Sequence, residues 1–152
     1  MAEHLRMILL VAVSVLMMVM SIDISQYSRS TKYLKEDLEV AVHDAALQID
    51  PLALAEGQIV FDEEKARETF IETLEINTGL TLDDYNIIDF EFFDHGNSVF
   101  PVTFESEHTR FSDMFFYPTI VVIIETETNK FFSFTHNSRD VRQVASYTYH
   151  LP

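Results

Sequence analysis

The chain has 152 residues, which is enough for one modest globular domain and a short accessory segment. Its formal net charge is -15, from 25 acidic and 10 basic side chains, and a field of that sign repels phosphates. We therefore expect no nucleic acid partner. The chain has no cysteine, so packing alone must hold its domain together.

The first predicted element is an apolar helix over residues 7–22, which contain no charge, no Gly and no Pro. Sixteen residues rise about 24 Å, against a hydrocarbon core of about 30 Å. Leu5 and Ile24 lengthen the apolar stretch at its two ends. The exit, residues 20–23, lacks the small-x-small pattern of a signal-peptidase site. We therefore expect residues 1–22 to form a tail and a retained transmembrane anchor.

The orientation of this anchor does not follow from local charge. His4 and Arg6 precede the apolar run, while Arg29, Lys32 and Lys35 follow it, so the positive-inside rule gives no clear answer. A very short leading tail followed by a long acidic part is typical of a signal anchor. We expect a single-pass protein of the cell membrane, with the acidic head outside the cytoplasm.

From Ile24 the apolar pattern becomes periodic, with one stripe at alternating three- and four-residue spacing, which predicts an amphipathic helical stalk over residues 23–50. Pro51 would end this helix, so one helix of about 65–70 Å would run from about Leu5 to about Asp50. The chain's own domain is the expected cover for the later part. The earlier part is a candidate self-assembly stripe between subunits. The stripe consists of Ile24, Tyr27, Thr31, Leu34, Leu38, Ala41, Ala45 and Gln48/Ile49, and its first four residues form the self-assembly candidate.

This layout resembles a known family. An acid at the exit of the apolar run (Asp23), an aromatic soon after (Tyr27), and Leu34 and Leu38 leading into Asp-Ala-Ala-Leu at residues 44–47 are similar to the N-terminal region of Tad-type pseudopilins. More broadly, the chain resembles type IV pilin-like proteins, which implies a β-rich head and a structural role. The chain lacks a basic leader ending in Gly or Ala, so prepilin-type processing is not expected.

The head is expected over residues 51–152, beginning with a connector over residues 51–58. Asp62 is a predicted N-cap, because Glu63 and Glu64 follow it in the first turn of a helix. Ala66, Phe70 and Leu74 share one face of this helix, and residues 77–79, Asn-Thr-Gly, supply a stop signal.

Beyond residue 81 the pattern favours antiparallel strands. Residues 85–93 alternate, residues 95–97 form a turn, and residues 99–104 are expected to return as the hairpin partner, with Pro101 placing that strand at an edge. Further strands are expected over 117–128, 131–135 and 145–151, with a turn at 129–130. The predicted core combines Phe70 and Leu74 with Phe90, Phe92, Ile123 and Phe132. The predicted class is α+β, with a long N-terminal helix and a small antiparallel sheet head carrying one further helix.

Candidate sites in the head are weak. Glu105, Glu107 and His108, with Asp113 nearby, are the densest ligand-like cluster, but they match no specific metal spacing. The acidic run Asp83, Asp84, Asp89, Glu91 and Asp94 lacks the pattern of a calcium loop. Asp94, His95 and Ser98 could be drawn as a hydrolase triad, but turn chemistry explains their spacing better. We therefore expect no cofactor, no metal and no enzymatic activity.

Aromatic residues at 111–117 form a possible docking patch, consisting of Phe111, Phe115 and Phe116. The alternative is that Phe115 and Tyr117 enter the core. The first functional hypothesis is a pilin-like structural subunit of a bacterial envelope assembly, of pilus, secretion or DNA-uptake type, which self-associates or binds envelope proteins. The alternative is a non-polymerising anchored protein that recruits a partner through its acidic head. A metal-dependent envelope enzyme using Glu105, Glu107 and His108 is the weakest hypothesis.

Overall fold

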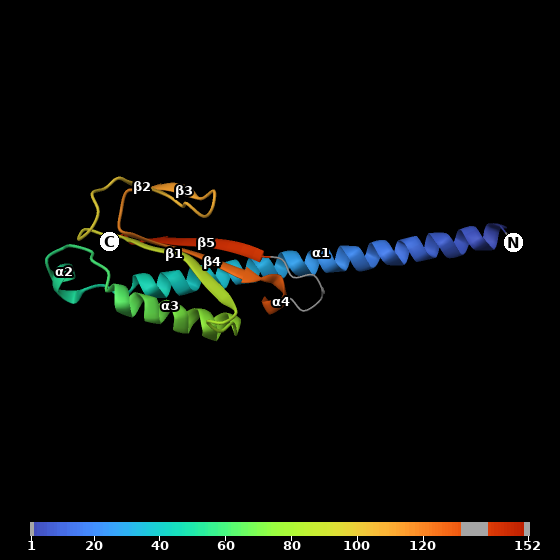
Figure 1. Cartoon of the computed structure of the whole chain (residues 1–152), viewed down its shortest axis with the longest axis horizontal. Helices are drawn as coiled ribbons and strands as arrows, with labels where there is room; N and C mark the ends of the chain where they lie inside the picture. Colours follow the sequence, from blue (N-terminus) through green and yellow to red (C-terminus); the bar gives the residue numbers. More distant parts are fainter. Residues whose placement is uncertain (1, 132–139, 151–152) are drawn as a thin grey trace. The chain divides into compact units, whose positions relative to one another are not determined.

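The computed structural model describes residues 2–131 and 140–150, and its fold class is α+β, as predicted. The chain divides into two compact units, Met1–Tyr33 and Leu34–Pro152, and the second of these is the head. The elements, labelled in Figure 1, are α1 (Ala2–Ala46), α2 (Pro51–Ala55), α3 (Glu63–Thr78), β1 (Tyr85–Phe93), β2 (Val102–Glu105), β3 (Ser112–Phe115), β4 (Thr119–Glu127), α4 (Thr128–Phe131) and β5 (Asp140–Thr148).

Helix α1 is one unbroken helix, because no Gly or Pro interrupts residues 2–46. It ends at Ala46, a few residues earlier than predicted. The chain leaves the helix there because Ile49 bridges to Phe61 in an extended conformation. The predicted connector then forms the short helix α2, which Asp50 caps by accepting a hydrogen bond of 2.7 Å from the backbone N–H of Leu52.

Helix α3 begins and ends where local sequence signals place it. The Asp62 carboxylate accepts a hydrogen bond of 3.2 Å from the backbone N–H of Lys65, and Glu63 and Glu64 occupy the first turn. Gly79 terminates the helix in the left-handed region, with φ of 71°. The predicted apolar face is confirmed, because Ala66, Phe70 and Leu74 are buried.

The main sheet has the antiparallel order β1-β4-β5. The central strand β4 is buried on both faces from Thr119 to Ile124, as its continuous apolar run predicted. Its register places Val122 opposite Phe90 and Ile120 opposite Phe92, with an irregularity in β1 between Ile87 and Asp89.

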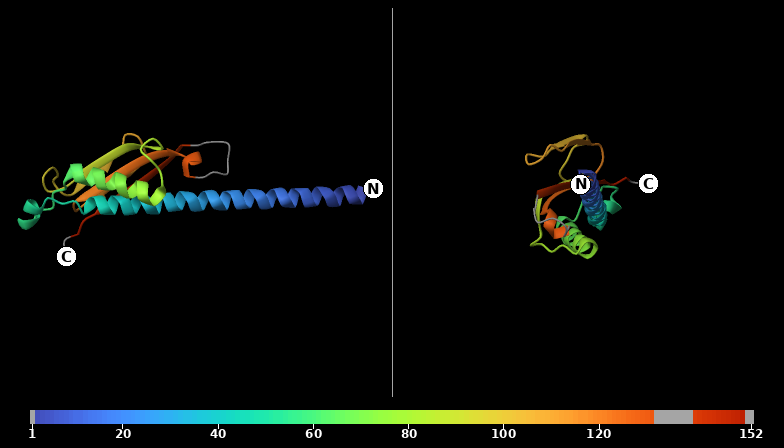
Figure 2. Two further views of the ribbon diagram at one scale, coloured as in Figure 1. Left: turned by 90° about the horizontal axis from the view of Figure 1, so that it is seen from below. Right: turned by 90° about the vertical axis from the view of Figure 1, so that its right-hand side faces the viewer.

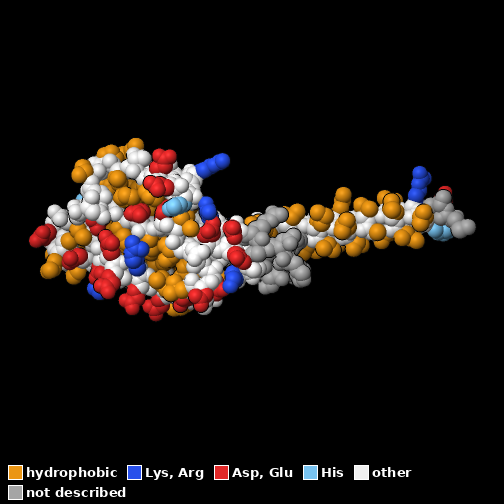
Figure 3. Space-filling view, in the orientation of Figure 1, with side chains coloured by type: hydrophobic (Ala, Val, Ile, Leu, Met, Phe, Trp, Pro, Cys, Tyr) orange, Lys and Arg blue, Asp and Glu red, His pale blue; other side chains and the backbone are white. Residues whose placement is uncertain are grey.

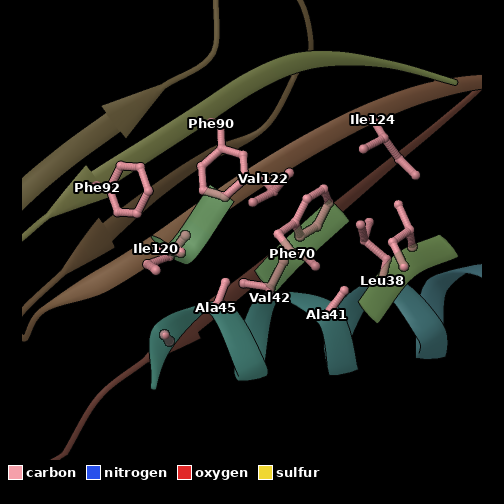
Figure 4. Close-up of a cluster of buried hydrophobic side chains, with 14 of the residues drawn as sticks. Leu38, Ala41, Val42, Ala45, Phe70, Phe90, Phe92, Ile120, Val122 and Ile124 are labelled. Carbon is pink, nitrogen blue, oxygen red and sulfur yellow. The ribbon is translucent and has the colours of Figure 1, made fainter. Parts of the chain in front are cut away.

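The head portion of α1 and helix α3 cover one face of this sheet, as the close-up in Figure 4 shows. Leu38, Ala41, Val42 and Ala45 of α1 are fully buried there. The prediction that the later stalk packs on the chain's own domain is therefore confirmed. Alternate residues of the strands complete this core, namely Phe90, Phe92, Ile120, Val122, Ile124 and Ala145.

The hairpin of β2 and β3 covers part of the opposite face, above the main sheet in the right-hand view of Figure 2. The ring of Phe93 lies 5.7 Å from that of Phe104 and 5.6 Å from that of Phe115. The hydroxyl of Ser106 donates a 2.6 Å hydrogen bond to the Asp89 carboxylate. These contacts fix the hairpin over β1 and produce a three-layered head.

Several strand predictions are wrong. Residues 99–104 do not pair with β1, because the doubly buried strand β4 takes that place and β2 pairs with β3 instead. Ile123 points away from the helices, since Val122 is the residue opposite Phe90. Thr128–Phe131 forms one helical turn where a turn at 129–130 was expected, so the strand predicted over 131–135 does not begin at residue 131. Its remaining residues, including the predicted core residue Phe132, lie outside the described part. The last strand begins at Asp140 and ends at Thr148, and not at 145 and 151.

Candidate functional site: the apolar helix and the head surface

In the described part of the chain, one helix is long and apolar enough to cross a membrane. It runs over Glu3–Ala46, and its best 18-residue window has a mean hydropathy of 2.6 with no buried residue. Large apolar side chains from Leu5 to Ile22 are 44–70% exposed, and they cover the orange surface of this segment in Figure 3. This surface is compatible with single-pass membrane anchoring.

The structure separates the four residues of the predicted self-assembly stripe. Ile24 is 66% exposed, and Tyr27 is 38% exposed. Thr31 is half-buried, and its hydroxyl donates a 2.9 Å hydrogen bond to the Tyr27 carbonyl. Leu34 is only 3% exposed and belongs to the head core. Its side chain is therefore not available for a contact between subunits, whereas Ile24 presents an apolar surface.

Charge is distributed unequally between the two units. The first unit contains the acids Glu3 and Asp23 and the bases Arg6, Arg29 and Lys32, which give a net charge of +1. The head contains 23 acidic and 7 basic side chains, for a net charge of -16. Figure 3 shows acidic side chains spread over the visible face of the head. The excess negative charge of the protein therefore lies in the head, and the first unit is close to neutral.

The predicted docking patch is only partly at the surface. Phe115 is 5% exposed and packs on Phe93, and Phe111 is half-buried with its ring 6.1 Å from that of Phe104. Phe116 is 61% exposed.

The prediction omitted two of the residues that form the exposed patch. Met114 and Tyr117 are 50% and 54% exposed, and together with Phe116 they form what we call the β3 rim. The period of two in extended backbone places Met114 and Phe116 on one face and Phe115 on the other, once the segment is known to be extended.

The candidate metal cluster does not assemble in the described residues, where no group of three or more His, Asp or Glu side chains could hold an ion. Glu105, Glu107 and His108 are all exposed. The backbone carbonyl of His108 accepts a 2.7 Å hydrogen bond from Arg142.

The Asp94 carboxylate is buried because it organises the turn after β1. One of its oxygens accepts hydrogen bonds from the backbone N–H groups of Gly96 and Asn97, at 2.8 and 3.1 Å. The other accepts a 3.0 Å hydrogen bond from the N–H of Phe61. This carboxylate therefore joins the turn to the segment before α3, as a buried acceptor whose partners satisfy it.

The other two members of the drawn triad have structural partners as well. His95 Nδ1 accepts a 2.9 Å hydrogen bond from the backbone N–H of Ile59. The Ser98 hydroxyl donates a 2.6 Å hydrogen bond to the side-chain oxygen of Asn97 and not to the His95 ring. Turn chemistry thus accounts for the spacing of these residues, as predicted.

The predicted acidic run is divided among different partners. Asp84 forms a 2.7 Å ion pair with Lys130, and it accepts hydrogen bonds from the backbone N–H and the hydroxyl of Thr81. These contacts hold the pKa of Asp84 well below its usual range. Asp89 binds Ser106, and Asp94 is in the turn described above. Asp84 lines a small hollow of about 160 Å³ together with other acids, and Lys130, which also lines it, donates a hydrogen bond to Asp84.

Comparison with known proteins gave no matching family, no matching curated protein and no matching solved structure. The resemblance to Tad-type pseudopilins over about residues 7–50 therefore stays a prediction.

Proposed function

We propose that the chain is a pilin-like structural subunit of a bacterial envelope assembly, anchored in the membrane by one pass, with its head outside the cytoplasm. The observation that supports this proposal is the composition of α1. Its N-terminal part carries apolar side chains that the described chain does not cover, and its C-terminal part forms part of the head core.

The apolar part of α1 requires a cover from outside the chain. Its side chains are exposed around the whole helix, and lipid tails cover such a surface without directional contacts. Beyond the apolar run, Ile24 continues the exposed apolar surface, and its neighbours Asp23 and Ser25 are polar residues. In the proposed arrangement this segment lies at the water interface. Lipid tails would not reach Ile24 there, so a second helix packed against it would be its cover.

The composition of residues 2–46 favours a structural subunit over a head on a flexible linker. A flexible tether would be rich in Gly, Ser or Pro, whereas residues 2–46 contain no Gly and no Pro. In the proposed assembly, contacts between neighbouring helices near Ile24 and Tyr27 order the subunits, and the acidic heads stay soluble through mutual repulsion.

Disulfide cross-linking tests this assembly directly, because the native chain has no cysteine. Ile24→Cys and Tyr27→Cys would be oxidised separately in intact membranes. The matched control is Gln26→Cys, which lies on the opposite side of the helix. A disulfide needs Cα atoms within about 7 Å, so we expect dimers of the first two variants and much less of the third. Equal cross-linking at all three positions, or none, would contradict the proposal.

The alternative function, an anchored accessory protein that recruits a partner through its head, is favoured by the exposed β3 rim. Met114, Phe116 and Tyr117 are each at least 50% exposed. Recruitment predicts that Ile24→Cys forms no dimers, and that replacing Phe116 by Ser abolishes binding of the partner in the cell. Under the structural proposal, substitutions of Ile24 or Tyr27 prevent assembly of the subunits in the cell.

A further inference from the structure

The hairpin of β2 and β3 covers the outward face of the main sheet unequally. Val121 and Ile123 of β4 point to this side and are completely buried. On the neighbouring strand β5, the residues that point to the same side are less covered. Arg142 and Ser146 are exposed, and Val144 and Thr148 are only half-buried. The cover therefore stops before β5.

Two hollows lie end to end along this open strand face. The first has a volume of about 620 Å³ and lies between Arg142 and Val144 on β5 and the loop from Glu107 to Phe111. The second has a volume of about 390 Å³ and lies between Ser146 and Thr148 on β5 and residues 113–117. We call the two hollows together the β5 groove.

The residues of β5 that line the groove alternate, because Arg142, Val144, Ser146 and Thr148 are separated by two positions, and His150 continues the series. At about 3.3 Å per residue, the lining from residue 142 to residue 150 extends roughly 26 Å. An extended peptide segment has the same repeat, so its alternate side chains match this floor.

The wall of the groove supplies apolar contact area. Met114 and Phe116 of the β3 rim line its second hollow, and Phe111 lines the first. Exposed aromatic side chains beside a hollow are the residues that most often carry binding energy in protein interfaces.

Charge determines which occupant fits. Glu107 and Asp113 line the groove together with Arg110 and Arg142. Glu125, outside the lining, forms a 2.6 Å ion pair with Arg142 and offsets its charge, so two acids and Arg110 remain in the lining. The whole head carries a net charge of -16, and this charge disfavours a second copy of the same head as the occupant of the groove. We propose that the β5 groove binds an extended, basic segment of a partner protein that places alternate apolar side chains on the groove floor.

The test uses the full-length protein in nanodiscs of phosphatidylcholine, which hold it as separate copies. A displayed library of random 12-residue peptides is selected on this sample, and the most enriched peptide is synthesised with a fluorescent label. Its affinity is then measured by anisotropy for the native protein and for Phe116→Ser, Ser146→Lys and Val99→Ser. Val99 is 90% exposed and does not line the groove, so it is the matched control for the loss of apolar surface.

We expect enrichment of peptides rich in Lys and Arg with apolar residues at alternate positions. Phe116→Ser and Ser146→Lys should each weaken binding about tenfold or more, and Val99→Ser should leave it unchanged. Both native side chains are exposed, and a thermal melt checks that the variants fold. Selection of acidic peptides, no enrichment at all, equal binding by all variants, or dimers in solution that Phe116→Ser dissolves would overturn the proposal. The result does not depend on assembly through α1, because each nanodisc presents one copy.

Discussion

Replacing Val15 by Arg tests whether the apolar part of α1 is a membrane anchor. Val15 lies near the middle of residues 7–22, which contain nine Ile, Leu and Val residues. At about -0.3 to -0.6 kcal/mol each, these nine contribute about -3 to -5 kcal/mol to insertion. An Arg at the helix centre costs about 2.5 to 3.5 kcal/mol, so the substitution removes about 3–4 kcal/mol in total. The partition coefficient should fall roughly 100- to 1,000-fold.

The assay is extraction of membranes with alkaline carbonate, followed by measurement of the protein in the pellet and in the supernatant. The native chain should stay in the pellet, and Val15→Arg should be divided between the fractions. A double variant, Val11→Arg with Val15→Arg, should be in the supernatant, because a second charge makes insertion unfavourable. Val15→Leu is the control for a changed side chain at the same site, and Val99→Arg is the control for an added charge in the head.

Full retention of the double variant in the pellet would refute the reasoning, because a lipid-embedded helix cannot absorb two central charges at this cost. Release of the native chain by carbonate would refute it as well. In that case the exposed apolar surface of α1 would be covered by protein.

The remaining predictions concern the head. Phe70→Ala should lower the free energy of unfolding by about 3–5 kcal/mol in urea, because Phe70 is fully buried, whereas the exposed Ile76→Ala on the same helix should change it by less than about 0.5 kcal/mol. Burial raises the pKa of Tyr85 to about 12, and its hydroxyl has no hydrogen-bond partner among the described residues. Tyr85→Phe should therefore leave stability unchanged or increase it in the same urea assay. The hydrogen bond from Lys130 lowers the pKa of Asp84. The contribution of ionised Asp84 to the free energy of unfolding is therefore fully present above the unfolded pKa of about 3.9. It is lost as the pH falls through the pKa of Asp84 in the folded protein. Lys130→Met should flatten this acid limb, measured as urea midpoints between about pH 5 and pH 2.

Elements defined by local signals were predictable. Asp62 and Gly79 bound α3 because a short carboxylate suits an N-cap and Gly suits positive φ. The run from Ile120 to Ile124 predicted a central strand, because a strand that is covered on both faces needs apolar side chains at consecutive positions. In each case the physical cause is in the segment itself.

Features that depend on distant residues were not predictable. An unbroken apolar run has no period, so the face of Ile123 follows only from the register that places Val122 opposite Phe90. The partner of β1 was misassigned because the nearest strand along the chain was chosen, whereas the most apolar strand gains more by pairing there. β3, with the sequence Ser-Asp-Met-Phe, has no β-branched residue and gave no strand signal.

The candidate sites were predictable only where local sequence determines them, as with the secondary-structure elements. The apolar surface of residues 7–22 follows from composition alone, and the structure leaves it exposed. The division of the stripe at Leu34 does not follow, because the same helical period continues on both sides of it. The β5 groove depends on where the hairpin stops on the sheet, and this boundary is set by contacts of Phe93 and Asp89 that the sequence pattern does not show.

The packing of α1 against β5 has a consequence for how the protein is made. His43 lies 4.7 Å from the ring of Tyr147, so the first helix of the head contacts a strand that is synthesised 104 residues later. Until the ribosome has completed β4 and β5, the apolar side of Leu38, Val42 and Ala45 lacks the sheet that covers it, and α3 supplies only part of the cover. A nascent chain of this protein therefore needs a temporary host for that surface, such as a chaperone or the membrane interface. Premature termination before Asp140 should consequently produce an aggregating fragment and not a smaller folded head.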